Sequence, residues 1–279
     1  MKDDKNKSRL LFVPSGGLGN RLRAIVSAVQ LSEATGTALR IVWFKDWGMG
    51  AEWREIFKPM KHYALREASL LDSLVYDRPR KRNFFVPKLF QNLLFEQRID
   101  EYDVTPLKRK NFDFCAWAKG RNSYMSCYQD FGAVDNSLYS DLFSPTDEIE
   151  QRIARNLEQL GDASIGIHVR RTDNRAAIER SPISLFFDAM DSIVRDNPAQ
   201  RFYLATDDEE TKNEMLKRYG DALLMSSSKA ERGTTEGIKD AVVEMFTLAR
   251  CREIYGTADS SFSVIASRIG DIPLTILEQ

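Results

Sequence analysis

The chain has 279 residues, of which 43% are hydrophobic and 29% are charged, and its formal net charge is −1. This length can bury one large core or two ordinary ones, and the nearly balanced charge provides no basic field that would favour nucleic acid. The three cysteines and two histidines lack the spacing of metal ligands, which argues against a disulfide framework and against a zinc site.

The N-terminal segment MKDDKNKSR is polar and has no apolar core, so nothing in it is typical of a signal peptide. No apolar run approaches the length of a membrane span. We therefore expect a soluble, cytoplasmic protein with reduced cysteines and no transmembrane segment. The sequence leaves the oligomeric state open.

The first half opens with a predicted strand at residues 10–14, a helix at 18–34 and a second strand at 38–44. Strand, helix and strand in this order predict a parallel sheet. The intervening GGLGNRLR could present backbone N–H groups to an anion. It lacks the ending of a P-loop and the full dinucleotide fingerprint, so close packing of helix on strand explains its glycines equally well.

Signals weaken between residues 45 and 140, where the order of elements is not predictable. Residues 110–128 could hold one or two strands. The aromatic cluster Trp43, Phe44, Trp47 and Trp53 could stack on sugar rings, although clustered tryptophans more often belong to a core.

The second half alternates regularly between strand and helix patterns. Thr146 is the expected N-cap of a helix at 147–160. Strands are expected at 165–170, 201–206, 222–225, 253–256 and 273–277, with helices at 182–195, 209–219, 236–250 and 261–269. The fold class is therefore α/β with two Rossmann-like domains, residues 1–143 and 144–279.

Three predicted strands of the second domain end in polar clusters, at residues 168–173, 206–208 and 257–261. The carboxyl ends of parallel strands meet at one edge, where ligands bind. Arg170 and Arg171 offer planar, permanently charged groups suited to phosphate. Together the clusters supply an anion site, hydrogen-bond acceptors and hydroxyls, which suit a nucleotide diphosphate that carries a sugar.

Each cluster also has a purely structural interpretation. His168 could be a hydrogen-bonded core histidine, and the two arginines could pair with Asp173 or Asp207. Polar side chains before a helix are typical caps, which would explain Asp207, Asp208, Ser260 and Ser261. Capping does not require three clusters at neighbouring strand ends, and this co-location favours a ligand site.

The motifs HVRRTD (168–173), YLATDD (203–208) and TADSSFSVIA (257–266) resemble, in the same order, those of α1,6-fucosyltransferases of the core N-glycan and nodulation-factor type. GGLGNRLR is similar to the opening glycine loop of the wider fucosyltransferase superfamily. The resemblance implies a GT-B-like fold, with two Rossmann-like domains facing across a cleft. It also implies an inverting, metal-independent glycosyltransferase that moves fucose from GDP-fucose to a hydroxyl of a glycan or glycolipid, without a cofactor.

The resemblance further implies which residues act. The donor would bind in residues 144–279 and the acceptor in residues 1–143. Arg170 matches the arginine that holds the β-phosphate of the donor and stabilises the leaving GDP. Glu179 is the candidate base, with Asp173 as the alternative. The implied donor site comprises Gly17, Gly19, Asn20, Arg21, His168, Arg170, Arg171, Asp207, Asp208, Ser260 and Ser261.

Two other functions remain open. The arginines and serines recognise phosphate rather than fucose, so a GT-B transferase that uses another nucleotide sugar is one alternative. The other is a non-catalytic protein that binds a sugar nucleotide or glycan and has lost the base.

Overall fold

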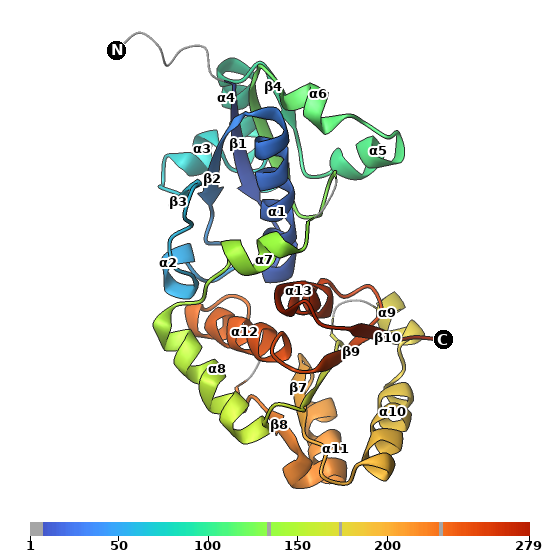
Figure 1. The fold of residues 1–279 in the computed structure, drawn as a ribbon. Coiled ribbons are helices and arrows are strands. Elements are labelled where there is room, and N and C mark those ends of the chain that lie inside the picture. Colours follow the sequence, from blue (N-terminus) through green and yellow to red (C-terminus); the bar gives the residue numbers. More distant parts are fainter. Residues whose placement is uncertain (1–7, 133–134, 173–174, 229–230) are drawn as a thin grey trace. The chain divides into compact units, whose positions relative to one another are not determined.

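The computed structural model describes residues 8–132, 135–172, 175–228 and 231–279 (Figure 1). The chain divides into two compact units, Met1–Phe143 and Ser144–Gln279. Each unit is an α/β domain built on a five-stranded sheet. The predicted α/β class with two Rossmann-like domains is thereby confirmed.

The first sheet has the strand order β3-β2-β1-β5-β4, and all its paired strands are parallel. Its strands are β1 (Arg9–Pro14), β2 (Ala38–Trp43), β3 (Ala64–Glu67), β4 (Gln97–Ile99) and β5 (Asn122–Cys127). The described helices of this unit are α1 (Leu18–Thr35), α2 (Trp53–Ile56), α3 (Asp72–Val75), η1 (Lys81–Asn83), α4 (Val86–Leu94), α5 (Val104–Arg109), α6 (Phe114–Ala118) and α7 (Ser137–Leu142).

Two glycines shape the ends of α1. Gly16, before the helix, has φ +80°, and Gly36, directly after it, has φ +67°. Both values lie in the left-handed region, which glycine adopts without steric cost. The helix predicted from the glycine loop to Gly36 is therefore present, and Gly36 ends it as expected.

Between residues 45 and 122 the structure consists of short elements joined by long turns. Residues 110–128, where one or two strands were considered, hold the helix α6 and the single strand β5. Trp43 and Trp53 are buried and pack edge to face, with ring centroids 5.4 Å apart. Trp47, in contrast, is 74% exposed. The tryptophan cluster is thus mainly core.

The second sheet has the order β10-β9-β6-β7-β8 and is also parallel. Its strands are β6 (Ile165–Val169), β7 (Phe202–Thr206), β8 (Leu223–Met225), β9 (Glu253–Thr257) and β10 (Leu274–Leu277). The described helices are α8 (Asp147–Leu160), α9 (Arg175–Arg180), α10 (Ile183–Asp196), α11 (Glu209–Tyr219), η2 (Gly220–Ala222), α12 (Thr235–Leu248) and α13 (Ser261–Gly270). The helix α9 was not predicted, and Thr146 precedes α8 without a capping hydrogen bond from its side chain.

Alternation along the central strand β6 assigns its side chains to two layers. Ile165, Ile167 and Val169 pack with Phe186 of α10 and Met215 of α11. The residues between them face the opposite layer, where His168 stacks on Phe262 of α13. The strands that follow β6 lie on both sides of it: β7 and β8 extend the sheet on one side, and β9 and β10 extend it on the other. Such switch points are where open α/β sheets bind ligands.

Candidate functional site

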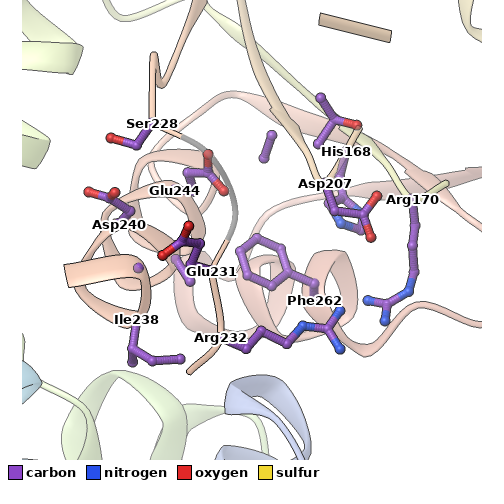
Figure 2. Close-up of a pocket in the computed structure, with 14 residues that line it drawn as sticks. His168, Arg170, Asp207, Ser228, Glu231, Arg232, Ile238, Asp240, Glu244 and Phe262 are labelled. Atoms are coloured by element: carbon purple, nitrogen blue, oxygen red, sulfur yellow. The ribbon is translucent and has the colours of Figure 1, made fainter. Parts of the chain in front are cut away.

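A cavity of about 100 Å³ opens at the carboxyl ends of β6 and β7 (Figure 2). Side chains from β6, β7, α12, α13 and the loop before α12 line it. Its lining comprises His168, Arg170, Ala205, Thr206, Asp207, Ser228, Glu231, Arg232, Gly237, Ile238, Asp240, Ala241, Glu244 and Phe262. All of these residues belong to the second unit.

His168 forms part of the cavity wall. Its ring stacks on Phe262 with centroids 5.1 Å apart and planes inclined by 20°. Burial, reinforced by the charge of Arg170, lowers the pKa of His168 to about 4, so the imidazole is neutral at pH 7. Its Nδ1 is buried and has no hydrogen-bond partner among the described residues. A buried polar atom of this kind is rare in native proteins and is consistent with a ligand contact.

Arg170 follows β6 and lines the same cavity. Its backbone N–H donates to Oγ1 of Thr257 at 3.0 Å, and this hydroxyl donates to the carbonyl of His168 at 3.1 Å. The side chain of Thr257 therefore joins the end of β9 to the end of β6 and fixes the backbone that carries Arg170.

Arg232 is a second guanidinium of the cavity, which the sequence analysis missed. In Figure 2 the guanidinium groups of Arg232 and Arg170 lie on the same side of Phe262. Arg232 stands in the polar loop before α12, where neither periodicity nor a motif distinguishes it from a solvated surface arginine. Two cations at one cavity suit a diphosphate.

Arg171 is not among the residues that line the cavity, so the structure does not bring the two adjacent arginines together there, and the donor contact of Arg171 stays a prediction. His168 and Arg170 face the cavity, and alternate residues of an extended chain point to opposite sides. The guanidinium of Arg171 donates from Nη1 to the carbonyl of Ile178 at 3.5 Å, while its Nη2 is buried without a hydrogen-bond partner among the described residues. Burial lowers its pKa.

Asp207 and Asp208 have different roles. Asp207 lines the cavity while its carboxylate accepts from the backbone N–H of Arg171 at 2.8 Å and from the hydroxyl of Thr172 at 2.6 Å. Asp208 is the N-cap of α11, and its Oδ2 accepts from the N–H of Thr211 at 2.8 Å. The predicted donor contact of Asp208 is thus replaced by the structural alternative, a helix cap.

Ser260 and Ser261 begin α13. Ser260 is 3% exposed and occupies the N-cap position, yet its side chain makes no capping hydrogen bond. Its Oγ is buried without a partner among the described residues. The capping interpretation therefore fails for Ser260, whereas Ser261 is the first residue of the helix proper.

Glu244 is the most perturbed carboxylate of the cavity and was also missed. Burial raises its pKa to about 8; Lys212 opposes this shift, and Asp240 and Asp207 add to it. In the sequence Glu244 interrupts the apolar stretch of α12, where it resembles a surface residue of an amphipathic helix. Only the packing of α12 against the other cavity elements reveals its environment.

Of the two candidate bases, the structure describes only Glu179. Glu179 lies on α9 with its side chain 65% exposed, and its Oε1 accepts from Nε of Arg175 at 2.9 Å. It does not line the cavity. Asp173 lies outside the described residues.

The residues predicted from the glycine loop belong to the first unit. Gly17 is the N-cap of α1, Gly19 is buried in its first turn, and Oδ1 of Asn20 accepts from Arg23 at 2.8 Å. Arg21 is fully buried. Its guanidinium donates to the carbonyls of Gly16 at 2.8 Å and Phe44 at 2.6 Å, and it pairs with Asp46 at 3.1 Å.

The side chain of Arg21 is thus engaged inside its own domain, and its assignment to the donor site stays a prediction. Burial lowers the pKa of Arg21 to about 10, which leaves it charged at neutral pH.

Among the residues that the structure describes, no group of three or more His, Cys, Asp or Glu side chains could hold a metal ion. None of the helices in this part of the chain is both long and apolar enough to cross a bilayer.

Two Rossmann-like domains, with a cavity at the switch point of the second, are the architecture of the GT-B class of fold. Solved structures that share this fold over nearly the whole chain are fucosyltransferases. NodZ α-1,6-fucosyltransferase, known from Bradyrhizobium, matches in a crystal soaked with GDP-fucose, with 19% identity, 94% of this chain and 93% of that chain covered, and a TM-score of 0.62.

POFUT1 in complex with GDP matches with 13% identity, 98% of this chain and 99% of that chain covered, and a TM-score of 0.60. A variant of FUT1 from Arabidopsis thaliana in complex with GDP matches with 13% identity, 99% of this chain and 71% of that chain covered, and a TM-score of 0.62. No protein-family model matches the sequence, and no curated protein matches it significantly. At these identities the similarity establishes the fold, and the resemblance to fucosyltransferases is confirmed at that level.

Proposed function

We propose that the chain is an inverting, metal-independent glycosyltransferase that moves fucose from GDP-fucose to a hydroxyl of a glycan or glycolipid. The observation that carries this proposal is the cavity of the second domain, with Arg170 and Arg232 on its wall. The similar NodZ and POFUT1 structures hold GDP-fucose or GDP. The fold and the chemistry of the cavity therefore point to the same class of ligand.

We assign Arg170 to the diphosphate of the donor. In fucosyl transfer, positive charge develops on the sugar while negative charge develops on the departing GDP. A guanidinium at the β-phosphate stabilises that negative charge, and the fixed backbone at Arg170 needs no rearrangement to do so. Arg232 would supply a second positive charge, and Ser260 a hydroxyl.

We assign Glu244 to the guanine of the nucleotide. In Figure 2 the ring of Phe262 lies between the carboxylate of Glu244 and the guanidinium of Arg170. A purine can stack on such an aromatic ring. A carboxylate can accept two hydrogen bonds from adjacent N–H donors, which guanine has and uracil lacks. This arrangement favours a guanine nucleotide over a uridine nucleotide.

Inversion also requires a base that accepts the proton of the acceptor hydroxyl. Glu179 and Asp173 remain the candidates. If one of them is the base, its amide variant, Glu179→Gln or Asp173→Asn, should abolish transfer while GDP still binds. If both variants transfer fucose at the normal rate, both candidates are wrong.

The primary experiment compares nucleotides. GDP should raise the melting temperature of the chain, whereas UDP and CMP at the same concentration should raise it little, because at a given concentration the ligand that binds the folded state more tightly stabilises it more. GDP-fucose should then be hydrolysed slowly to GDP and fucose without an acceptor. Stabilisation by UDP with no response to GDP would favour a GT-B transferase with another donor.

A pH series gives a sharper test of the guanine contact. With a pKa of about 8, Glu244 is ionised in about one tenth of the molecules at pH 7 and in about nine tenths at pH 9. Guanine donors prefer the ionised carboxylate, so GDP affinity should rise about tenfold over this range. Asp240, Asp207, Glu231 and Arg232 also line this cavity, and the buried Lys212 acts electrostatically on Glu244. The variant Glu244→Gln distinguishes the titration of Glu244 from that of these neighbours, because the rise of GDP affinity with pH should disappear in this variant.

One observation favours a second candidate function. Glu179 forms an exposed ion pair with Arg175 instead of lining the cavity. A non-catalytic protein that binds a sugar nucleotide would have this arrangement. GDP binding without any hydrolysis or transfer of fucose would support it.

A further inference from the structure

The helix α4 of the first domain exposes its apolar residues and buries a polar one. Its buried residues are Pro87 and the polar Gln91. Its apolar residues Leu89, Phe90, Leu93 and Leu94 are 63%, 38%, 77% and 48% exposed. An amphipathic helix on a soluble domain normally turns its apolar face to the core. Here that face is directed to the surroundings.

The orientation is held by Gln91. Its Nε2 donates to the carbonyls of Val75 at 3.2 Å and Asp77 at 2.9 Å. Its Oε1 accepts from Arg98 at 3.3 Å. A buried amide with these partners cannot leave its position cheaply, because each donor or acceptor would lose its hydrogen bond. The outward direction of the leucines is therefore built into the fold.

Two phenylalanines extend the exposed apolar face. Phe84 is 88% exposed and Phe85 is 49% exposed. Their φ angles are +51° and +56°, in a region that bulky residues rarely adopt. The backbone thus carries strain at two residues that gain little burial in return, which is typical of functional surfaces. We call Phe84, Phe85, Leu89, Phe90, Leu93 and Leu94 the apolar α4 surface.

Cations accompany this surface. Lys81, Arg82 and Lys88 are exposed and stand within the same stretch of sequence, which contains no acidic residue from 79 to 94. Together with Arg80 they line a hollow of about 500 Å³, which Tyr102, Asp100 and Asp103 also line. Asp100 pairs with Arg98, and Arg80 pairs with Asp77. The cationic side chains outnumber the acidic ones in this hollow.

From this combination we infer that the apolar α4 surface binds an anionic lipid bilayer. Large apolar side chains flanked by lysine and arginine are the composition of segments that lie in the plane of a membrane interface. The helix has nine residues, so it would lie on the bilayer rather than cross it. A bilayer also accounts for the cations, because anionic head groups attract them.

Binding to a bilayer goes beyond sugar transfer and does not depend on it. If the first domain also binds the acceptor, as the sequence analysis expects, the apolar α4 surface would bring the protein to acceptors that are linked to membrane lipids. That extension rests on the proposed function.

The test measures binding of the full chain to vesicles by sedimentation. Vesicles of phosphatidylglycerol and phosphatidylcholine in equal parts should bind it, and vesicles of phosphatidylcholine alone should bind it much more weakly. The variant Lys81→Gln with Arg82→Gln should lower the affinity about 30-fold. Phe84→Ser or Leu93→Ser should lower it about tenfold or more, because each removes a large apolar contact.

Matched controls lie on α11 of the second domain. Leu216 is 44% exposed and Lys217 is exposed, so Leu216→Ser and Lys217→Gln make the same chemical changes away from the surface. Both should leave vesicle binding unchanged. All variants should keep the melting temperature and its response to GDP, which separates membrane binding from the transferase proposal.

Two outcomes would overturn the inference. One is equal vesicle binding by the wild type and by the Phe84→Ser and Leu93→Ser variants. The other is a lipid-free dimer, seen by analytical ultracentrifugation, that Leu93→Ser dissociates, since the apolar face would then belong to a contact between copies.

Discussion

The carboxyl edges of the two sheets carry similar residue types but differ in how these residues are satisfied. In the first domain the edge is closed by a buried ionic network. Asp46 pairs with Arg21 at 3.1 Å and with Arg78 at 2.5 Å, and Arg78 lies 3.6 Å from Glu101. The hydroxyl of Ser15 donates to the same Glu101 carboxylate. Each charge of this network therefore has a partner within the domain.

At the edge of the second sheet, polar atoms are left over. Nδ1 of His168 and Oγ of Ser260 are buried without partners among the described residues, and Arg170 lines an open cavity. Buried polar atoms without partners cost free energy, whereas a closed ionic network does not need a ligand. The comparison teaches that position at a strand end is insufficient evidence for a site. Unsatisfied polar atoms alone do not separate the two edges, because Nε of Arg78 in the first network is also buried without a hydrogen-bond partner; the difference is that the second edge carries the cavity, whereas the network of the first pairs each of its charges within the domain.

The largest effect is expected when the closed network is broken. Arg21→Met would leave the carbonyls of Gly16 and Phe44 without their side-chain donor and would remove one of the two guanidinium partners of Asp46, which keeps Arg78. With about 1–3 kcal/mol for each buried acceptor and the loss of one ion pair, the free energy of unfolding should fall by about 3–5 kcal/mol. Urea unfolding of the chain measures this change. Normal stability combined with lost GDP binding would instead place Arg21 in the donor site.

A fall in pH should lower the free energy of unfolding through His168, which lies at the carboxyl edge of the second sheet. The folded pKa of His168, about 4, lies below its ordinary value of 6.5. The folded state therefore binds fewer protons, and its stability should fall as the pH drops from 6.5 to 4, by roughly 3 kcal/mol in total. Unfolding titrations of the wild type and of His168→Asn test this. The variant should lose less stability over the same range, and identical slopes would contradict the prediction.

Neighbouring arginines offer the clearest contrast in binding. Arg170→Ala removes a cation from the cavity and should weaken GDP binding by roughly 1.5–3 kcal/mol, the usual contribution of a hydrogen bond to a charged group. Arg171→Ala should change GDP affinity little, because its guanidinium contacts the carbonyl of Ile178 instead. Titration calorimetry measures both. Equal losses in the two variants would show that both arginines serve the diphosphate.

The smallest effect is expected for the capping carboxylate. Asp208→Ala removes the hydrogen bond to the N–H of Thr211 and should lower stability by about 1 kcal/mol. Asp208→Asn should retain most of the cap. GDP affinity should be unchanged in both variants, and a marked loss would return Asp208 to the list of donor contacts.

Much of the second domain was predictable because its elements are long enough to show a period. The alternation of Ile165, Ile167 and Val169 indicates a strand with one face in a core, and the structure has β6 there. The same alternation, continued past the strand, separates Arg170 from Arg171. The sequence analysis treated them as a pair because it considered their charge and not the direction in which each points.

Other features depend on contacts that no local pattern contains. Glu244 has an unusual environment only because β7, α11 and α12 meet around it, and each comes from a different part of the chain. The elements between residues 45 and 122 are mostly too short to complete two helical turns or a strand of several alternations. Their order is set by tertiary packing rather than by local preference.

The hydroxyl of Thr257 has a consequence for how fast a ligand can leave. It bonds the backbone on both sides of Val169, through His168 and Arg170, before any ligand arrives. The entropy of ordering this backbone is therefore lost during folding instead of at each binding event. A Thr257→Val variant, similar in shape but without the hydroxyl, should release its nucleotide faster while associating at nearly the normal rate, because a loosened contact shortens residence more than it slows encounter.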